Sequence, residues 1–379
     1  MITLTEAVSR KQRRSMIVEK NKHAGRFAVL DSWRAVSILL VLACHMLPLG
    51  PSAWQLNAMA GPLGMSLFFT LSGFLITSNV LKDPSVSTFL VRRLARILPL
   101  AYLATLICLS IQNKPLDYYV SHWLFFMNYR TEYSTPLTSP FWSLCVEVHF
   151  YLLIAYLLAF YGRRGIFVLP ILGLMITVGR IYVGVYTGNK THERGDEILA
   201  GVSLALIYAD QLGEFGRWVR ARISAVPLGL LIILFMVSCH PVTGGFQYLR
   251  PYLGAAVVGH TLFVAPANSP WLASRPLRYL AEISYALYVI HPLGRYGWFA
   301  SGTVVAKYLK LPVTLLVIFG LAHLSTFFYE RHWIALGKFW THRWSTESIR
   351  GSRLRIPITA SARAARTLPS QPIPERVSA

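Results

Sequence analysis

Arg34 and His45 stand eleven positions apart in an otherwise apolar stretch of sequence. At about 100° per residue, this spacing returns both side chains to one helix face, about 20° past three full turns. Along the axis they would lie about 16 Å apart, with Arg34 near the membrane surface and His45 well into the membrane. Ionisable side chains inside a span are costly and are candidate functional residues, and an imidazole can accept and return a proton. An interfacial arginine and a histidine that hydrogen-bonds between helices are the structural alternatives.

Three arginines, Arg92, Arg93 and Arg96, open the third apolar block. Arg93 and Arg96 are three residues apart and therefore face the same way on a helix. Guanidinium groups match phosphate oxygens, so this row could bind phosphate groups at the cytoplasmic membrane surface. A topology anchor is the alternative that composition alone favours.

Glu147 is an acidic residue within an apolar run, about two turns from the outer end of the fourth expected helix. A carboxylate in this setting must be paired or protonated. It could orient the imidazole of His45 and stabilise its charged form, as an acid does beside a catalytic histidine. A structural salt bridge is the alternative.

Two further polar segments are less specific. The acidic residues of segment 192–197 lie where a helix is expected to begin, so we predict that they cap it. Tyr285 and Tyr288 are spaced to share a face of a later helix. His291, which follows them, is either a polar group of the same cavity or a hydrogen-bonding residue of the bundle.

The elements that position these residues are predicted to be membrane-spanning helices. The chain has 379 residues, 54% hydrophobic and 14% charged, whereas soluble domains carry about 25% charged residues. Its apolar blocks of about 18 to 22 residues match a hydrocarbon core of about 30 Å. This pattern excludes a soluble globular enzyme, a disordered chain and a secreted disulfide scaffold. We predict an all-α, polytopic integral membrane helical bundle with about ten transmembrane helices, near residues 33–50, 62–81, 94–112, 141–161, 165–187, 195–211, 224–240, 251–267, 279–301 and 312–329.

The net charge of +21 comes from Lys and Arg residues that lie mostly between the apolar blocks. Such residues mark cytoplasmic loops, so we predict that both termini are cytoplasmic and that nucleic acid is not a partner. The expected domains are a basic cytoplasmic segment over 1–26, a membrane domain over 27–340 and a basic, disordered cytoplasmic tail over 341–379. We expect no cleavable signal peptide, and we expect the four isolated cysteines to be core thiols without a metal or disulfide.

Together these segments resemble acyltransferase family three, the membrane O-acyltransferases that modify surface polysaccharides, nodulation factors and some antibiotics. The similarity runs from about residue 27 to 340, with Val148 and Arg331 standing where the family often has an acid and a proline. Five segments carry the match in family order: Arg34 with His45, Gly64 to Thr77, Arg93 with Arg96, Phe141-Trp142-Ser143 with Glu147, and Ser284 to Tyr288 with His291.

The resemblance implies transfer of an acyl group, commonly acetyl, from cytoplasmic acyl-CoA to a hydroxyl of a cell-surface glycan or glycolipid precursor in the bacterial cytoplasmic (inner) membrane. It implies no permanently bound cofactor and no metal; the partners are acyl-CoA, the acceptor and membrane lipid. A transporter or flippase for an acylated glycan, or an acyltransferase with a small-molecule acceptor, is the alternative. The expected roles are catalytic for His45 and Glu147, donor-binding for Arg34, Arg92, Arg93 and Arg96, and acceptor-binding for Trp142, Ser143, Tyr285 and His291.

Overall fold

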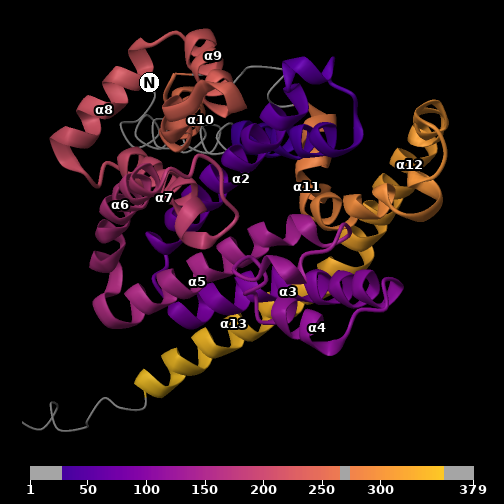
Figure 1. Cartoon of the computed structure of the whole chain (residues 1–379). Helices are drawn as coiled ribbons and strands as arrows, with labels where there is room; N and C mark the ends of the chain where they lie inside the picture. Colours follow the sequence, from indigo (N-terminus) through magenta and orange to yellow (C-terminus); the bar gives the residue numbers. More distant parts are fainter. Residues whose placement is uncertain (1–27, 265–273, 354–379) are drawn as a thin grey trace, which may run out of the picture.

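The computed structural model describes residues 28–264 and 274–353, and the regular elements in these ranges are all helical (Figure 1). The predicted all-α class is therefore confirmed. The expected basic segment 1–26 lies outside the described residues. Of the expected tail, residues 341–353 belong to the last helix, and residues 354–379 lie outside the described part.

The helices are described in chain order. The first runs over Ala28–Met46. The others are α2 (Leu56–Val80), α3 (Val86–Ile111), α4 (Leu116–Trp123), α5 (Trp142–Tyr161), α6 (Leu169–Val183), α7 (Thr191–Tyr208), α8 (Gly213–Ala225), α9 (Leu228–Cys239), α10 (Arg250–Phe263), α11 (Arg275–Ile290), α12 (Val304–Leu324), the π-helix η8 (Ser325–Glu330) and α13 (Arg331–Arg353).

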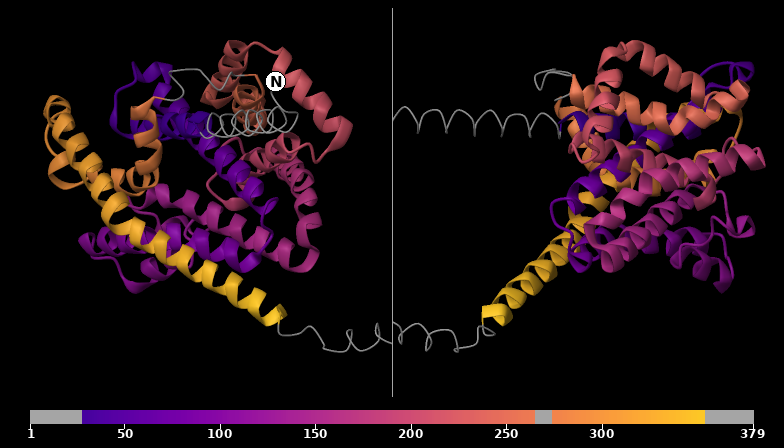
Figure 2. Two further views of the ribbon diagram at one scale, coloured as in Figure 1. Left: turned by 180° about the vertical axis from the view of Figure 1, so that it is seen from behind. Right: turned by 90° about the vertical axis from the view of Figure 1, so that its left-hand side faces the viewer.

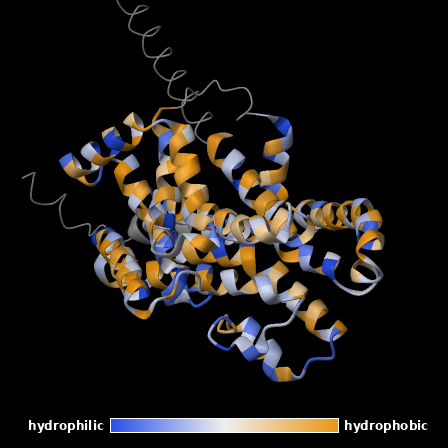
Figure 3. Cartoon of the chain, turned by 45° about the horizontal axis from the view of Figure 1, so that its top comes forward, coloured by the Kyte–Doolittle hydropathy of each residue, from blue (hydrophilic) through white to orange (hydrophobic). Residues whose placement is uncertain are grey.

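The helices have the apolar surface of a membrane protein. Apolar residues extend along most of them (Figure 3), and α6 exposes Met175, Val178 and Tyr182 at 64%, 63% and 91%. An apolar surface of this kind suits lipid and not water.

The count of about ten spans is not confirmed. Within the described residues, five helical runs are long and apolar enough to cross a membrane, or six if α7 and α8, bent by 106°, form one span. Each of the ten predicted segments overlaps a helix, but α6, α9, α10 and α11 have only 15, 12, 14 and 16 residues. A crossing needs about 20 residues, so four predicted spans are short for one.

The centre of the bundle is the contact between α2 and α7, which glycines bring unusually close. A Cβ atom built on Gly73 would lie 1.9 Å from the backbone oxygen of Ile198, and one built on Gly201 would lie 2.1 Å from that of Thr70. Both distances are far inside van der Waals contact. The two helices can therefore pack backbone to backbone only because these positions have no side chain.

The first helix ends at Met46, which places His45 in its last turn and not deep within a helix over 33–50 as predicted. Asn57 of α2 explains this end, because its side-chain amide donates to the carbonyl oxygens of Ala43, Cys44 and Leu47 at 3.2, 3.0 and 2.7 Å. Carbonyl groups of a last turn have no partner within the helix, so Asn57 supplies the missing donor. His45 is thereby fixed against α2.

The arginine row lies on α3, which is capped at its N-terminus by Ser85, whose hydroxyl accepts from the Thr88 amide at 3.3 Å. Its first half packs against α13, where Arg92 Nε donates to Thr341 Oγ1 at 3.2 Å. In the left-hand view of Figure 2, α12, η8 and α13 form one long rod, and in both views its α13 end extends beyond the rest of the bundle. The rod closes one side of the space in front of the arginines.

Candidate active site

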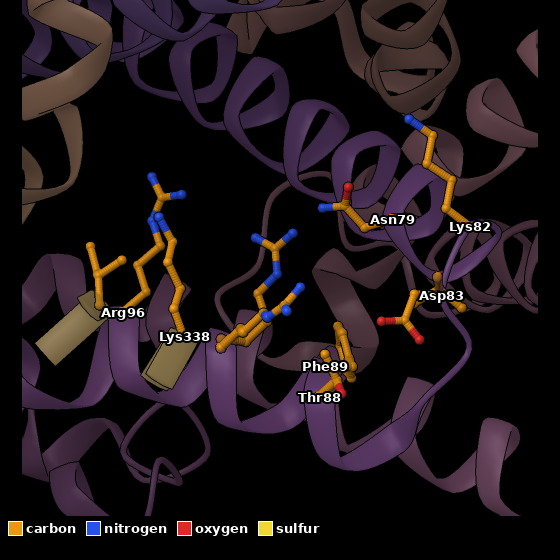
Figure 4. Close-up of a pocket in the computed structure, with 11 residues that line it drawn as sticks. Asn79, Lys82, Asp83, Thr88, Phe89, Arg96 and Lys338 are labelled. Atoms are coloured by element: carbon orange, nitrogen blue, oxygen red, sulfur yellow. The ribbon is translucent and has the colours of Figure 1, made fainter. Parts of the chain in front are cut away.

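A basic cavity of about 520 Å³ opens between α2, α3 and α13 (Figure 4). It is lined by five basic residues and one acid, and in Figure 4 the charged ends of Arg96 and Lys338 are directed into the space between the helices. These residues are Lys82, Arg92, Arg93, Arg96, Lys338 and Asp83. The predicted donor-binding arginines Arg92, Arg93 and Arg96 are thus brought to one site, with the addition of two lysines that the sequence analysis did not select.

Arg34, the fourth predicted donor-binding residue, lines a neighbouring side cavity of about 530 Å³. This side cavity shares Arg96 and Lys338 with the basic cavity. It is more mixed in charge, since the acids Asp31, Glu282 and Glu330 also line it. The highest density of unbalanced positive charge therefore lies in the basic cavity.

A smaller middle cavity, of about 40 Å³, joins Arg34, Arg93 and Arg96 to Glu147. Ser72 Oγ and the Tyr151 hydroxyl each donate to Glu147 Oε1 at 2.6 Å, and the carboxylate is 5% exposed. Glu147 therefore lies among the arginines and does not line the cavity that holds His45. The prediction that Glu147 orients His45 is wrong in the structure, because the partner of His45 comes from another helix.

The histidine cavity, of about 320 Å³, lies at the other end of the bundle and is lined by His45, Trp142 and Arg194 together with residues of the connecting loops. A narrow cavity of about 10 Å³ lies between it and the middle cavity. The narrow cavity shares Arg34, Phe68 and Ser284 with the middle cavity, and Val41, Met65 and Tyr288 with the histidine cavity. Successive cavities, each sharing lining residues with the next, thus extend from the arginine row to His45, and we refer to this series as the interior route.

His45 is paired with His291. The distance from His45 Nδ1 to His291 Nε2 is 2.9 Å, and the rings are stacked 9° from parallel. His291 Nδ1 lies 2.7 Å from the carbonyl oxygen of Tyr288, which can only accept a hydrogen bond. In the neutral pair, His291 Nδ1 therefore carries the proton, His291 Nε2 accepts, and His45 donates from Nδ1. This leaves the lone pair on His45 Nε2 free to act as a base.

The four predicted acceptor-binding residues separate into two groups. Trp142 lines the histidine cavity, and His291 is the partner of His45. Ser143 is fully buried and donates to the Tyr288 hydroxyl at 2.6 Å, so it supports the cavity wall. Tyr285 lines the side and middle cavities and donates to the carbonyl oxygen of Ile97 at 2.6 Å. Tyr285 therefore lies near the arginines and does not line the histidine cavity with Trp142.

The sequence analysis missed the importance of Arg194, which lines the histidine cavity and is 2% exposed. In segment 192–197 the capping prediction holds for Glu193, whose side chain accepts from the Lys190 amide at 3.4 Å. Asp196 and Glu197 are instead fully buried and pair with arginines. The three-residue spacing of Arg194 and Glu197 was the one available signal.

Comparison with known proteins decides the family. A family model described as an acyltransferase domain matches residues 27–331 of this chain. The chain belongs to this acyltransferase family. The matched range agrees closely with residues 27–340, over which the sequence resembles acyltransferase family three. It includes all residues that line the cavities, except those of α13 that come after residue 331.

Several curated relatives are similar to this chain over most of its length. A candidate O-acetyltransferase of Staphylococcus aureus (strain COL) is 28% identical over 355 residues, which covers 79% of this chain and 56% of the relative. The peptidoglycan O-acetyltransferase OatA of Listeria monocytogenes is 28% identical, with 69% and 48% covered. YrhL of Bacillus subtilis (strain 168), a candidate peptidoglycan O-acetyltransferase, is 25% identical, with 72% and 49% covered.

The chain spans about half the length of these relatives. No solved structure matches it.

Proposed function

We propose that the chain is an integral membrane O-acyltransferase that moves an acetyl group from acyl-CoA to a hydroxyl of a cell-surface glycan or glycolipid precursor. The observation that carries this proposal is the interior route between two chemically different ends. One end gathers cations, and the other holds a histidine pair with a free basic nitrogen. Family membership and the names of the relatives support acyl transfer as the reaction that uses both ends.

The basic cavity is suited to the phosphate groups of coenzyme A. Arg92, Arg93, Arg96, Lys82 and Lys338 surround it, and guanidinium forks match phosphate oxygens. The pantetheine arm is long, thin and flexible, and it would reach His45 through the narrow cavity once side chains there move apart, because about 10 Å³ is room for a single water molecule. The nucleotide is too large to follow it. Glu147, which lines the middle cavity with Arg93 and Arg96, offsets part of the positive charge along this route.

The histidine cavity is suited to the acceptor. Trp142 offers an aromatic face of the kind that packs against sugar rings, and loop residues Ser134 and Asn189 at the cavity wall offer polar groups. The acceptor hydroxyl would approach His45 Nε2, which removes its proton as the oxygen attacks the thioester carbon. His291 holds His45 in the required tautomer and acts as a positioning residue.

The charge distribution supports an orientation for this proposal. Lys and Arg residues are enriched in cytoplasmic loops, which favours a basic cavity and both termini on the inside, where acyl-CoA would be the donor. The histidine cavity then faces outward, in a bacterial cytoplasmic membrane, toward the glycan. Because two relatives carry peptidoglycan in their names, a peptidoglycan fragment is the first acceptor to test.

The test is transfer of labelled acetyl groups from acetyl-CoA to peptidoglycan fragments by the purified protein in detergent, where a transporter has no gradient to use. We expect transfer by the wild type and a loss of about 10² to 10⁴-fold for His45→Ala. Arg93→Gln and Arg96→Gln should each raise the KM for acetyl-CoA by about tenfold or more, since a charge-assisted hydrogen bond is worth about 1.5–3 kcal/mol. Arg164→Gln, an exposed position away from the cavities, is the matched control.

Two results would count against the proposal. Full activity of His45→Ala would remove the base from the mechanism. An unchanged KM in both α3 arginine variants would remove the phosphate site.

A further inference from the structure

Five ionisable side chains lie buried beside the histidine cavity, on α6, α7 and α10. Their exposed fractions do not exceed 2%, although isolated charges in such surroundings are very costly. They are Arg180, Arg194, Asp196, Glu197 and Arg250. We refer to them as the buried charge cluster.

The cluster contains three cations and two anions. Arg180 pairs with Asp196, and Arg250 Nε lies 2.7 Å from Glu197 Oε1. Arg194 Nε lies 3.4 Å from Glu197 Oε2, as an ion pair without hydrogen-bond geometry. With all five groups ionised, one positive charge is left over.

Arg194 differs from the other two arginines in its hydrogen bonds. Arg180 and Arg250 each donate to the backbone oxygen of Tyr186 as well as to their acids. Among the described residues, Nε and Nη1 of Arg194 have no hydrogen-bond partner. A buried guanidinium N–H group without an acceptor is costly and calls for a ligand.

Arg194 is also the member of the cluster that lines the histidine cavity. Its guanidinium lies 5.4 Å from the ring centroid of Trp142, which lines the same cavity. A buried cation that has N–H groups without a hydrogen-bond partner is thus part of the wall of the cavity that also holds His45. Donors of this kind, aimed at a place where negative charge develops, are a major source of catalytic acceleration.

We propose that Arg194 is a catalytic residue that donates a hydrogen bond to the acyl carbonyl oxygen and stabilises the oxyanion formed on it. This inference rests on the proposed acyl transfer. The acceptor oxygen forms a bond to the thioester carbon, its proton moves to His45 Nε2, and the carbonyl electron pair moves to the oxygen beside Arg194. When the intermediate collapses, the C–S bond breaks, and the thiolate of coenzyme A leaves and takes up the proton.

The test compares Arg194→Lys and Arg194→Gln with Arg250→Lys and Arg250→Gln in the purified full chain. Arg250 is the matched control because it is equally buried and binds the same Glu197, but does not line the cavity. We expect each Arg194 variant to lose about 10² to 10³-fold in kcat, with the KM for acetyl-CoA unchanged. The Arg250 variants should lose much less activity, although they should lose comparable thermal stability.

Two further readouts separate the oxyanion role from others. Release of free thiol from acetyl-CoA in the absence of acceptor uses water as the nucleophile, and it should fall by the same factor as glycan transfer. Added guanidine should restore part of the activity of Arg194→Ala. If Arg194→Ala does not fold, the release of free thiol by Arg194→Lys still tests the oxyanion role.

Three results would overturn the inference. Transfer lost with thiol release intact would mean that Arg194 contacts the acceptor and not the acyl oxygen. Equal losses in the Arg194 and Arg250 variants, without rescue by guanidine, would mean that the cluster is only structural. Full activity of the Arg194 variants, together with an inactive His45→Ala variant, would reject the oxyanion role of Arg194 but not the proposed acyl transfer. An inactive wild type would instead reject the proposed acyl transfer itself.

Discussion

At the scale of single residues, the histidine pair makes a prediction about His291. Replacement of His291 by Leu removes the acceptor of the His45 Nδ1 proton, so that either ring nitrogen of His45 can carry it. We expect kcat to fall by about 10²-fold or more, as when a catalytic histidine loses the partner that fixes its tautomer. His291→Gln should retain more activity, because its side-chain oxygen can accept the same proton. Acetyl transfer by the purified variants, with kcat and KM measured separately, checks this.

His122→Leu is the control for that comparison. His122 is a buried histidine whose Nδ1 lies 2.8 Å from the Tyr118 carbonyl oxygen, and it lines none of the five cavities. Its loss should lower stability without a selective effect on kcat. Equal activity of His291→Leu and the wild type would show that His45 needs no partner.

The residue-level comparison shows what spacing along one helix can and cannot predict. The shared face of Arg93 and Arg96 depends only on helix geometry, and the structure places both in one cavity as expected. The partner of His45 depends on which helix lies opposite, and the sequence could not choose between Glu147 and His291. Arg194 was missed for the same reason, because Trp142 lies on another helix, α5, and comes next to Arg194 only in the folded bundle.

At the scale of helices, the close approach of α2 and α7 predicts that Gly73→Ala is strongly destabilising. The added methyl group would lie 1.9 Å from the Ile198 backbone oxygen, which cannot move aside as a flexible side chain can. Overpacking of this kind costs about 1–3 kcal/mol or more. We expect a lowered Tm in detergent and reduced acetyl transfer, since α7 carries Arg194.

Gly179→Ala is the matched control, because a Cβ built on this glycine of α6 meets nothing within 4 Å. Alanine is a better helix former than glycine by about 1 kcal/mol, so the Tm should stay constant or rise. A wild-type Tm for Gly73→Ala would contradict the close packing of α2 and α7.

The helices themselves were largely predictable, whereas their ends and their number of crossings were not. Each predicted segment overlaps a helix, because apolar composition identifies the helices of a membrane protein. The end of the first helix at Met46 depends on Asn57, a residue of the next helix. The bend between α7 and α8 depends on positive φ angles at Asp210 and Gly213, of 53° and 56°. These features arise from tertiary contacts and backbone conformation that hydropathy does not record.

At the scale of the whole molecule, function depends on the connection between distant cavities. The basic cavity lies at one end of the route and His45 at the other, so neither end alone can perform the proposed reaction. The middle and narrow cavities are small, so a thin acyl-carrying arm would have to displace side chains to pass, and a nucleotide would be excluded. A block in this narrow part should therefore separate donor binding from transfer.

Ser284 is the position at which to place the block, since it lines both the middle and the narrow cavity and its hydroxyl donates only within α11, to the Ala281 carbonyl oxygen. In Ser284→Phe the phenyl ring would occupy the junction between the two cavities. We expect acetyl transfer to fall by at least about 10²-fold, because the thioester no longer reaches His45 in a reactive geometry. Binding of desulfo-coenzyme A, or of 3′,5′-ADP as a probe of the phosphate site alone, should remain within a few-fold of wild type.

Ser284→Ala, which removes the same hydroxyl but leaves the junction open, should retain transfer. Wild-type transfer by a folded Ser284→Phe variant would mean that the acyl group reaches His45 by another route.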